Sequence, residues 1–186
     1  TGLANMTVAG AYRATSAYLS YMREALAYHR SLIAAVPGQD GILGVCVYKG
    51  RVFAFRNAVG GATAAMYEAT SGGWVSRKAG LAPGGRYEFV IHNFDGTGGA
   101  DKIYGVSGTH KGFQYDPNTN TWTDITTGMG VDAPTHVAVH LSRLFFSFAG
   151  GSVQWSSVGD PMTWSVITGA GEIALGQDVT AMRALK

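Results

Sequence analysis

Two kinds of hydrophobic pattern divide this chain. Over residues 15–36, apolar side chains recur every three or four positions, which predicts a helix with a wide apolar face. Pro37 and Gly38 then end the helix, because proline disfavours helical geometry in the residue before it. From about residue 41 onward, short apolar runs alternate with Gly-rich turns, the pattern of β-strands. The sequence therefore predicts a mainly β protein with an N-terminal α-helix.

The β-rich part contains three related segments of about 40–50 residues, each with four predicted strands. Each segment has a basic residue before an apolar strand, at Arg51, Lys102 and Arg143. Four strands in this length are typical of a propeller blade, because one small sheet cannot bury both of its faces alone. The predicted fold is a partial β-propeller of about three four-stranded blades.

Aromatic residues recur at corresponding places in the three segments. We expect their rings, each of which buries roughly 150–250 Å², to fill the space between successive sheets. The predicted blade core consists of Trp74, Trp122 and Trp164 in the last strands, and Tyr67, Tyr115 and Trp155 in the middle strands.

The repeats set the expected boundaries. A helical lead-in segment, 1–38, precedes blades at 39–82, 83–130 and 131–170, and residues 171–186 begin a further blade. Propellers usually have about 4–8 blades, so we expect the chain to be a fragment of a longer protein. An open three-unit sheet or a sandwich is the alternative.

The predicted helix is apolar over much of its circumference, so more than one side must be covered. Its apolar face either packs on its own domain or docks on a neighbouring subunit. The residues predicted for such a subunit interface are Tyr18, Tyr21, Met22, Tyr28 and Leu32.

Composition narrows the class of protein. Glycine accounts for 27 of 186 residues, charged residues for 14% and aromatic residues for 11%, which excludes an intrinsically disordered chain. A single cysteine, Cys46, excludes an intramolecular disulfide and a Cys-rich zinc module, and we expect it to be a small buried side chain. No apolar run approaches the ~20 residues of a membrane-spanning helix.

The net charge is only +2, with no basic block that would bind nucleic acid tightly. Four scattered basic residues on predicted turns are candidates for transient contact with DNA, and simple solvation is the alternative. They are Arg56, Arg77, Lys78 and Lys111.

One turn carries oxygen ligands at calcium-like spacing. Asn93, Asp95, Thr97 and Asp101 occupy positions 1, 3, 5 and 9, around Gly98. Side-chain oxygens at alternate positions can surround Ca²⁺, and the spacing is similar to the calcium loops of integrin-type propellers. Threonine replaces a carboxylate and no terminal glutamate follows, so a plain turn is the alternative and calcium the only cofactor considered.

Catalytic patterns are absent from the sequence, which contains no nucleophile elbow, phosphate-binding loop or zinc-protease motif. His136 and His140 share one face of a predicted strand, but two imidazoles alone make a weak zinc site. The stretch SSVGDPMTW at residues 156–164 is similar to the Asp-box turn of sialidase propellers, which is structural. We therefore predict no catalytic residue and no enzyme.

Two resemblances add to this interpretation. The segment FQYDPNTNTWTDITTGM, residues 113–129, is similar to a kelch blade. SLIAAVPGQDGILGVCVYKGRVFAFRN, DKIYGVSGTHKGFQYD and HLSRLFFSFAGGSVQWSSVGDPMTWSVITGAGEIALGQDVT together resemble tailed-bacteriophage virion proteins, the β-propeller components of the tail nozzle or hub.

The phage resemblance implies a structural role in the virion, after synthesis in the host cytoplasm. Copies would form a homo-oligomeric ring around the DNA exit channel, contacting other tail, portal or adaptor proteins and, transiently, genomic DNA. Two alternatives stay open: a kelch-like interaction adaptor, and a glycan-binding tail propeller that recognises a receptor.

Overall fold

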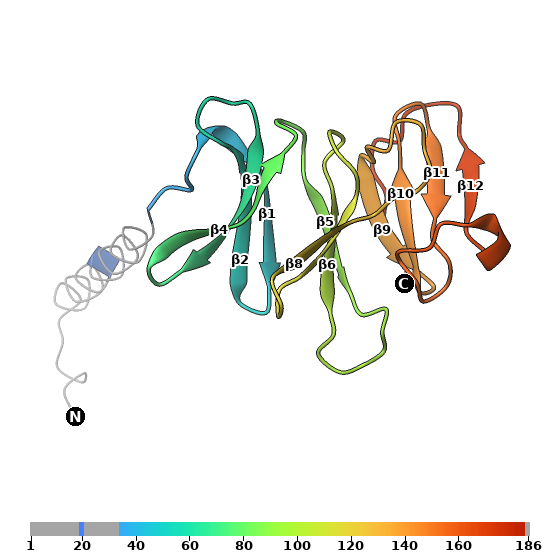
Figure 1. Ribbon diagram of the computed structural model, residues 1–186, viewed down its shortest axis with the longest axis horizontal. Helices are drawn as coiled ribbons and strands as arrows, with labels where there is room; N and C mark the ends of the chain where they lie inside the picture. The colour runs from blue at the N-terminus through green and yellow to red at the C-terminus, as the bar shows by residue number, and fades with distance from the viewer. Residues whose placement is uncertain (1–18, 21–33, 185–186) are drawn as a thin grey trace, which may run out of the picture.

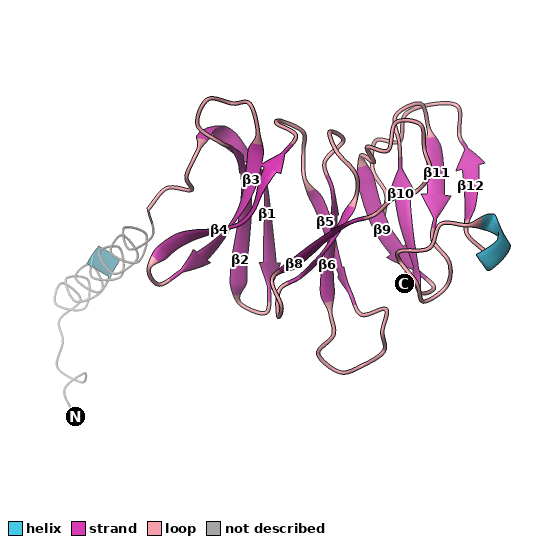
Figure 2. Ribbon diagram, in the orientation of Figure 1, coloured by secondary structure: helices cyan, strands magenta, loops and turns pink. Residues whose placement is uncertain are grey.

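The computed structural model describes residues 19–20 and 34–184. Within that part, twelve strands form three four-stranded antiparallel sheets, with very little helix (Figures 1 and 2). The sheets stand side by side in chain order and do not close into a ring (Figure 1). The prediction of a mainly β fold built from three four-stranded units is confirmed.

Each sheet is a simple meander in which consecutive strands are neighbours. The first sheet contains β1 (Gln39–Tyr48), β2 (Arg51–Asn57), β3 (Ala64–Thr70) and β4 (Gly73–Leu81). The second contains β5 (Glu88–His92), β6 (Lys102–Val106), β7 (Phe113–Asp116) and β8 (Thr121–Asp124). The third contains β9 (His136–His140), β10 (Arg143–Ser147), β11 (Ser152–Trp155) and β12 (Gly171–Ala174), with the short 3-10 helix η1 (Val166–Thr168) before β12.

The core lies between the sheets, because each sheet turns alternate residues to its two faces. In the second and third sheets, we call the face that packs on the preceding sheet the leading face and the opposite one the trailing face. In the first sheet, the trailing face is the one that packs on the second sheet, and the leading face is the opposite one. One buried cluster joins the trailing face of the first sheet to the leading face of the second, and includes Phe55, Met66 and Phe113. The other joins the second sheet to the third and includes Tyr104 and Phe146.

Two local features fix how the first sheet meets the second. A Cβ atom on Gly44 would lie 2.5 Å from the Tyr87 Cβ, so only glycine allows β1 to approach the segment before β5 this closely. The Tyr87 backbone N–H donates to the Leu43 carbonyl at 3.0 Å across the same junction. The first two sheets are thereby joined through their backbones as well as their side chains.

The expected boundary at residue 171 is wrong. Residues 171–174 form β12, which pairs with β11 and completes the third sheet instead of opening a further blade. The predicted last strand around Trp164 is replaced by a turn built on Asp160, whose carboxylate accepts from the Met162 N–H at 2.9 Å and the Thr163 hydroxyl at 2.6 Å. This turn places Trp164 outside the strands, and the fourth strand forms later in the chain.

The segment predicted to form the N-terminal helix lies mostly outside the described residues. Leu19 and Ser20 are helical, whereas residues 34–36, which the pattern includes in the helix, are not. The predicted interface residues, Tyr18, Tyr21, Met22, Tyr28 and Leu32, all fall outside the described residues.

Candidate functional site

The contact between the first two sheets contains a stacked aromatic pair. Trp122 lies on Phe113 with ring centroids 3.9 Å apart and an interplanar angle of 16°. Tyr115 is fully buried nearby, meets Phe53 edge-on at 5.6 Å, and donates its hydroxyl to the Asn120 side chain at 3.0 Å. Two predicted core residues, Trp122 and Tyr115, therefore sit where sheet meets sheet.

The next contact repeats the arrangement. Trp164 stacks on Phe146 with centroids 5.0 Å apart and an interplanar angle of 20°. Its indole N–H donates to the Pro161 carbonyl at 2.9 Å, which fixes the ring against the Asp160 turn. Trp164 thus reaches the leading face of its sheet from a loop, whereas Trp122 does so from strand β8.

The third tryptophan lies at the open end of the stack. Trp74 is opposite Ala69 in register, and Tyr67 is opposite Ala54, which places both aromatics on the leading face of the first sheet. The Trp74 indole N–H donates to the Ala34 carbonyl at 2.6 Å. Among the described residues no further sheet covers this face, and both aromatics are half-buried.

Two valines mark this open face as apolar. Val45 and Val47 lie opposite Ala54 and Val52 on β2, and their side chains are 55% and 59% exposed. The corresponding valines of the third sheet, Val137 and Val139, pack into the core against the second sheet. The leading face of the first sheet therefore has the apolar character of the two faces that are covered.

Trp155 does not lie on the same face of its sheet as Tyr67 and Tyr115 do in theirs, so the predicted equivalence of the three residues is wrong. Trp155 pairs with Phe145 and lies on the trailing face of the third sheet. The centroids of the Trp155 and Phe145 rings are 5.9 Å apart. Gln154 takes the corresponding place on the leading face, opposite Phe146. Because side chains alternate along a strand, an alignment error of one residue moves a ring to the other face.

A buried ion cluster joins the first sheet to the turn between β7 and β8, and sequence reasoning missed it. Glu68 is only 5% exposed and accepts from Arg51 at 2.6 Å and from Arg77 at 2.7 Å. Arg51 also donates to the Pro117 carbonyl at 2.5 Å, across the junction. The hydrogen bond from Arg51, then that from Arg77, lowers the pKa of Glu68, against the opposing effect of burial.

The two carboxylates predicted to bind calcium pair with different lysines. The Asp95 carboxylate pairs with Lys102 at 3.1 Å, whereas that of Asp101 pairs with Lys49 at 2.9 Å. The Asn93 amide donates to the Thr97 carbonyl at 2.5 Å. Each carboxylate is thus engaged by its own lysine, and calcium binding stays a prediction from the sequence.

The four basic residues predicted to touch DNA all engage neighbouring groups. Arg56 donates to backbone carbonyls at the start of β1, and Arg77 belongs to the buried ion cluster. Lys78 lies 5.7 Å from the centre of an indole ring of β8, and Lys111 donates to a threonine hydroxyl at 2.9 Å. A DNA contact by these side chains stays a prediction.

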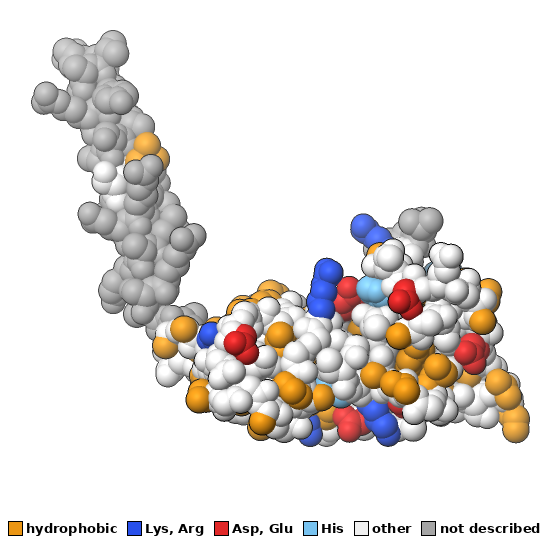
Figure 3. Space-filling view, turned by 90° about the horizontal axis from the view of Figure 1, so that it is seen from above, with side chains coloured by type: hydrophobic (Ala, Val, Ile, Leu, Met, Phe, Trp, Pro, Cys, Tyr) orange, Lys and Arg blue, Asp and Glu red, His pale blue; other side chains and the backbone are white. Residues whose placement is uncertain are grey.

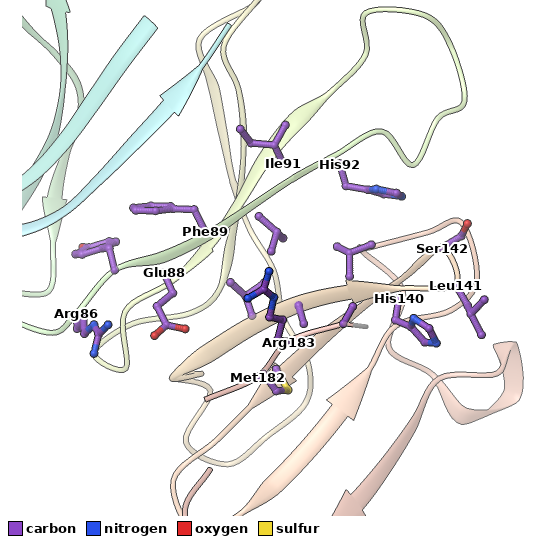
Figure 4. Close-up of a pocket in the computed structure, with 16 residues that line it drawn as sticks. Arg86, Glu88, Phe89, Ile91, His92, His140, Leu141, Ser142, Met182 and Arg183 are labelled. Atoms are coloured by element: carbon purple, nitrogen blue, oxygen red, sulfur yellow. The ribbon is translucent and has the colours of Figure 1, made fainter. Parts of the chain in front are cut away.

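A groove of about 840 Å³ lies between β5, β9 and residues 182–184. Arg86, His92, His140 and Arg183 line it together with Glu88 (Figure 4). Beside it, the Glu88 carboxylate contacts His136 Nδ1 at 2.9 Å, and His136 Nε2 lies 2.8 Å from a backbone carbonyl. Both partners are acceptors, so both are hydrogen bonds only when both ring nitrogens carry protons.

Other chemistry-bearing groups are packed rather than exposed. Cys46 is buried as predicted, and burial raises its pKa to about 11, which keeps it a neutral thiol. Burial lowers the pKa of His110, whose Nε2 lies 2.9 Å from the Tyr87 hydroxyl. Within residues 19–20 and 34–184, no three His, Cys, Asp or Glu side chains form a group that could hold a metal ion.

Hydrophobic side chains are scattered over the view from above, and charged ones are few (Figure 3). No helix in the described part of the chain has the length and hydropathy needed to cross a membrane.

Comparison with known proteins gives a fold and no family. No protein-family model and no curated protein matches the chain. Among solved structures, the computationally designed Ika8 protein matches with a TM-score of 0.54 and 11% identity, over 83% of this chain and 43% of that one. The computationally designed Ika4 protein matches with a TM-score of 0.53 and 10% identity, over 83% and 86%. The chain thus spans less than half of Ika8, and at these identities the likeness concerns the fold alone.

Proposed function

We propose that this chain is a non-enzymatic structural component of a bacteriophage tail, part of a propeller-like nozzle or hub ring around the DNA exit channel. In this role it resides in the virion and works by packing against other sheets and subunits. The observation that carries the proposal is the leading face of the first sheet, with Val45, Val47, Tyr67 and Trp74, which no sheet in the described part of the chain covers.

The internal contacts indicate what such a face accepts. In the second and third sheets, the corresponding face meets the aromatic trailing face of another four-stranded sheet. Large apolar faces of this kind are normally covered in soluble proteins, because their exposure to water is unfavourable. The occupant that fits is another sheet of the same repeat, from the rest of a ring.

The assignment to a phage tail rests on the sequence resemblance, which includes the turn at residues 156–164 and the segment at 169–180. The low charge of the chain agrees with a ring subunit that buries its sides against neighbours. A DNA conduit works best without tight phosphate binding, and the net charge of +2 is compatible with that.

Electron microscopy tests the proposal directly. An antibody raised against the purified chain is expected to label the tail of the tailed phage that encodes it, and purified full-length protein is expected to form rings that persist in high salt. A monomeric full-length protein with a recruiting domain would favour the kelch-like adaptor instead. Hydrolysis of a cell-surface polysaccharide by the purified protein would overturn the non-enzymatic role.

A further inference from the structure

The leading face of the third sheet carries an amide and a carboxylate beside an indole ring. Phe146, Gln154 and Glu172 lie directly opposite one another on β10, β11 and β12. Trp164 covers Phe146, the first member of this row. The two polar side chains therefore follow the aromatic pair across the sheet toward its outer strand.

A cavity of about 290 Å³ opens at this place, and Trp164, Gln154, Glu172 and Met129 are among the residues that line it. Its size is near the lower end of ordinary ligand pockets. It lies between the third sheet and the loop after β8, which includes residues 127–130.

The loop wall of the cavity is held in place by hydrogen bonds. The Thr127 hydroxyl and backbone N–H donate to the two carboxylate oxygens of Asp132 at 2.8 and 3.0 Å. The Met129 backbone N–H donates in turn to the Thr127 hydroxyl at 3.3 Å. A ligand would meet a preformed wall, which lowers the entropic cost of binding.

Gln154 supplies the amide of this cavity. Its side chain is 9% exposed, and its amide makes no hydrogen bond to any residue in the described part of the chain. By contrast, Gln114 on β7 accepts from the Tyr104 hydroxyl at 3.1 Å. The Gln154 amide is not among the fully buried unpaired polar groups, so it reaches the space of the cavity, where a ligand can supply both a donor and an acceptor.

We propose that this cavity binds a neutral pyranose sugar. Trp164 and Met129 offer an apolar wall to the C–H face of the ring, while the Gln154 amide donates to one hydroxyl and accepts from another. Glu172 accepts from the Ser152 hydroxyl through Oε1 at 2.6 Å, which leaves its second oxygen for a sugar hydroxyl. The lining contains no lysine or arginine, so a phosphate or sulfate group would find no positive charge and would be repelled by Glu172. The site belongs to the third sheet and does not depend on the proposed tail role.

Nuclear magnetic resonance of the ¹⁵N-labelled chain tests the site with methyl glycosides of glucose, galactose and N-acetylglucosamine as probes. At least one is expected to shift the Gln154 side-chain amide and the Trp164 indole signals in a saturable way. Gln154→Ala is expected to weaken this binding about tenfold, as the loss of one or two neutral hydrogen bonds does. The matched control Gln177→Ala changes an exposed glutamine outside the cavity and is expected to leave binding unchanged.

Absence of saturable shifts with all three glycosides overturns the proposal, and so does equal binding by the Gln154→Ala and Gln177→Ala variants. If Gln154→Ala lowers the melting temperature, Glu172→Gln decides instead, because the exposed Glu172 side chain can be changed without opening the core. Glu172→Gln is then expected to weaken the same binding severalfold, and unchanged affinity counts against the site.

Discussion

The Trp164 indole lies on the Phe146 ring at 5.0 Å, and Trp122 lies on Phe113 in the same relation at 3.9 Å. Each pair covers the leading face of its sheet and packs against the sheet before it. These two pairs present their rings to the sheet before them, whereas Trp74 lies on a face that no described sheet covers.

Removing the indole of Trp122 is expected to cost far more stability than removing that of Trp74. Trp122→Ala leaves a cavity beside Phe113, and the free energy of unfolding is expected to fall by about 3 kcal/mol. Trp74→Ala at the open end is expected to cost about 1 kcal/mol. Urea denaturation of the two variants measures the difference, and equal losses would contradict an uncovered leading face.

A charge on the open face of the first sheet is expected to prevent ring formation without unfolding the chain. Val47→Asp places a carboxylate on the exposed leading face, where covering it with another sheet would require desolvation. Size-exclusion chromatography of full-length protein measures the loss of rings. The control is Val59→Asp, a valine 84% exposed in a loop, which is expected to leave assembly intact. Rings that form equally well with both variants would show that this face is not an assembly surface.

Glu68 is expected to make the stability of the protein depend on acidic pH. Its hydrogen bonds to Arg51 and Arg77 lower its pKa in the folded state, so it contributes stability above its unfolded value of about 4.5. That contribution is lost as the pH falls through the lowered folded pKa.

Glu68→Gln leaves two arginines without a buried anion and is expected to cost about 2–4 kcal/mol at pH 7. The difference in free energy of unfolding between Glu68→Gln and the unmodified protein should become steadily smaller as the pH falls. Thermal unfolding at several pH values measures this difference. A gap that stays constant from pH 7 down to pH 2 would be inconsistent with the ionised cluster.

Substitutions in the hairpin between β9 and β10 are expected to raise the stability of the protein. Leu141 and Ser142 have φ values of 46° and 55°, both in the left-handed region that a type I′ turn requires. Replacing the pair by Asn and Gly is expected to raise the free energy of unfolding by about 1 kcal/mol, because neither new residue is strained there. Val131→Asn at another exposed loop position serves as the control and is expected to have almost no effect.

Cys46 is expected to resist alkylation in the folded protein. Burial raises its pKa to about 11, so the nucleophilic thiolate is scarce at pH 8. Iodoacetamide labelling followed by mass spectrometry should show slow modification in buffer and rapid modification in denaturant. Fast labelling of the native chain would mean that β1 opens readily around this thiol.

The sequence predicts the strands correctly. It does not predict which face of a sheet a side chain occupies when an alignment error of one residue reverses that face. Short apolar runs between Gly-rich turns, and the repeated basic residue before an apolar strand, predict three four-stranded units because strand and turn signals are local properties of the chain. The repeat aligns Trp155 with Tyr67 and Tyr115, but strand pairing sets it opposite Phe145 on the other face of its sheet. The sequence places Phe113 and Phe146 in strands, but it does not predict that the tryptophans stack on them.

For the candidate sites too, local features can be predicted from the sequence and long-range contacts cannot. The recurring aromatic positions, the apolar strands and the turn residues can be read from the amino-acid order alone, since these depend on neighbours in the chain. The three-dimensional packing alone shows that Trp164 reaches its sheet from a loop, that β12 completes that sheet, and that Gln154 lies beside Glu172 in a cavity. Those relations join residues far apart in the chain through pairing register and packing, and no local pattern records them.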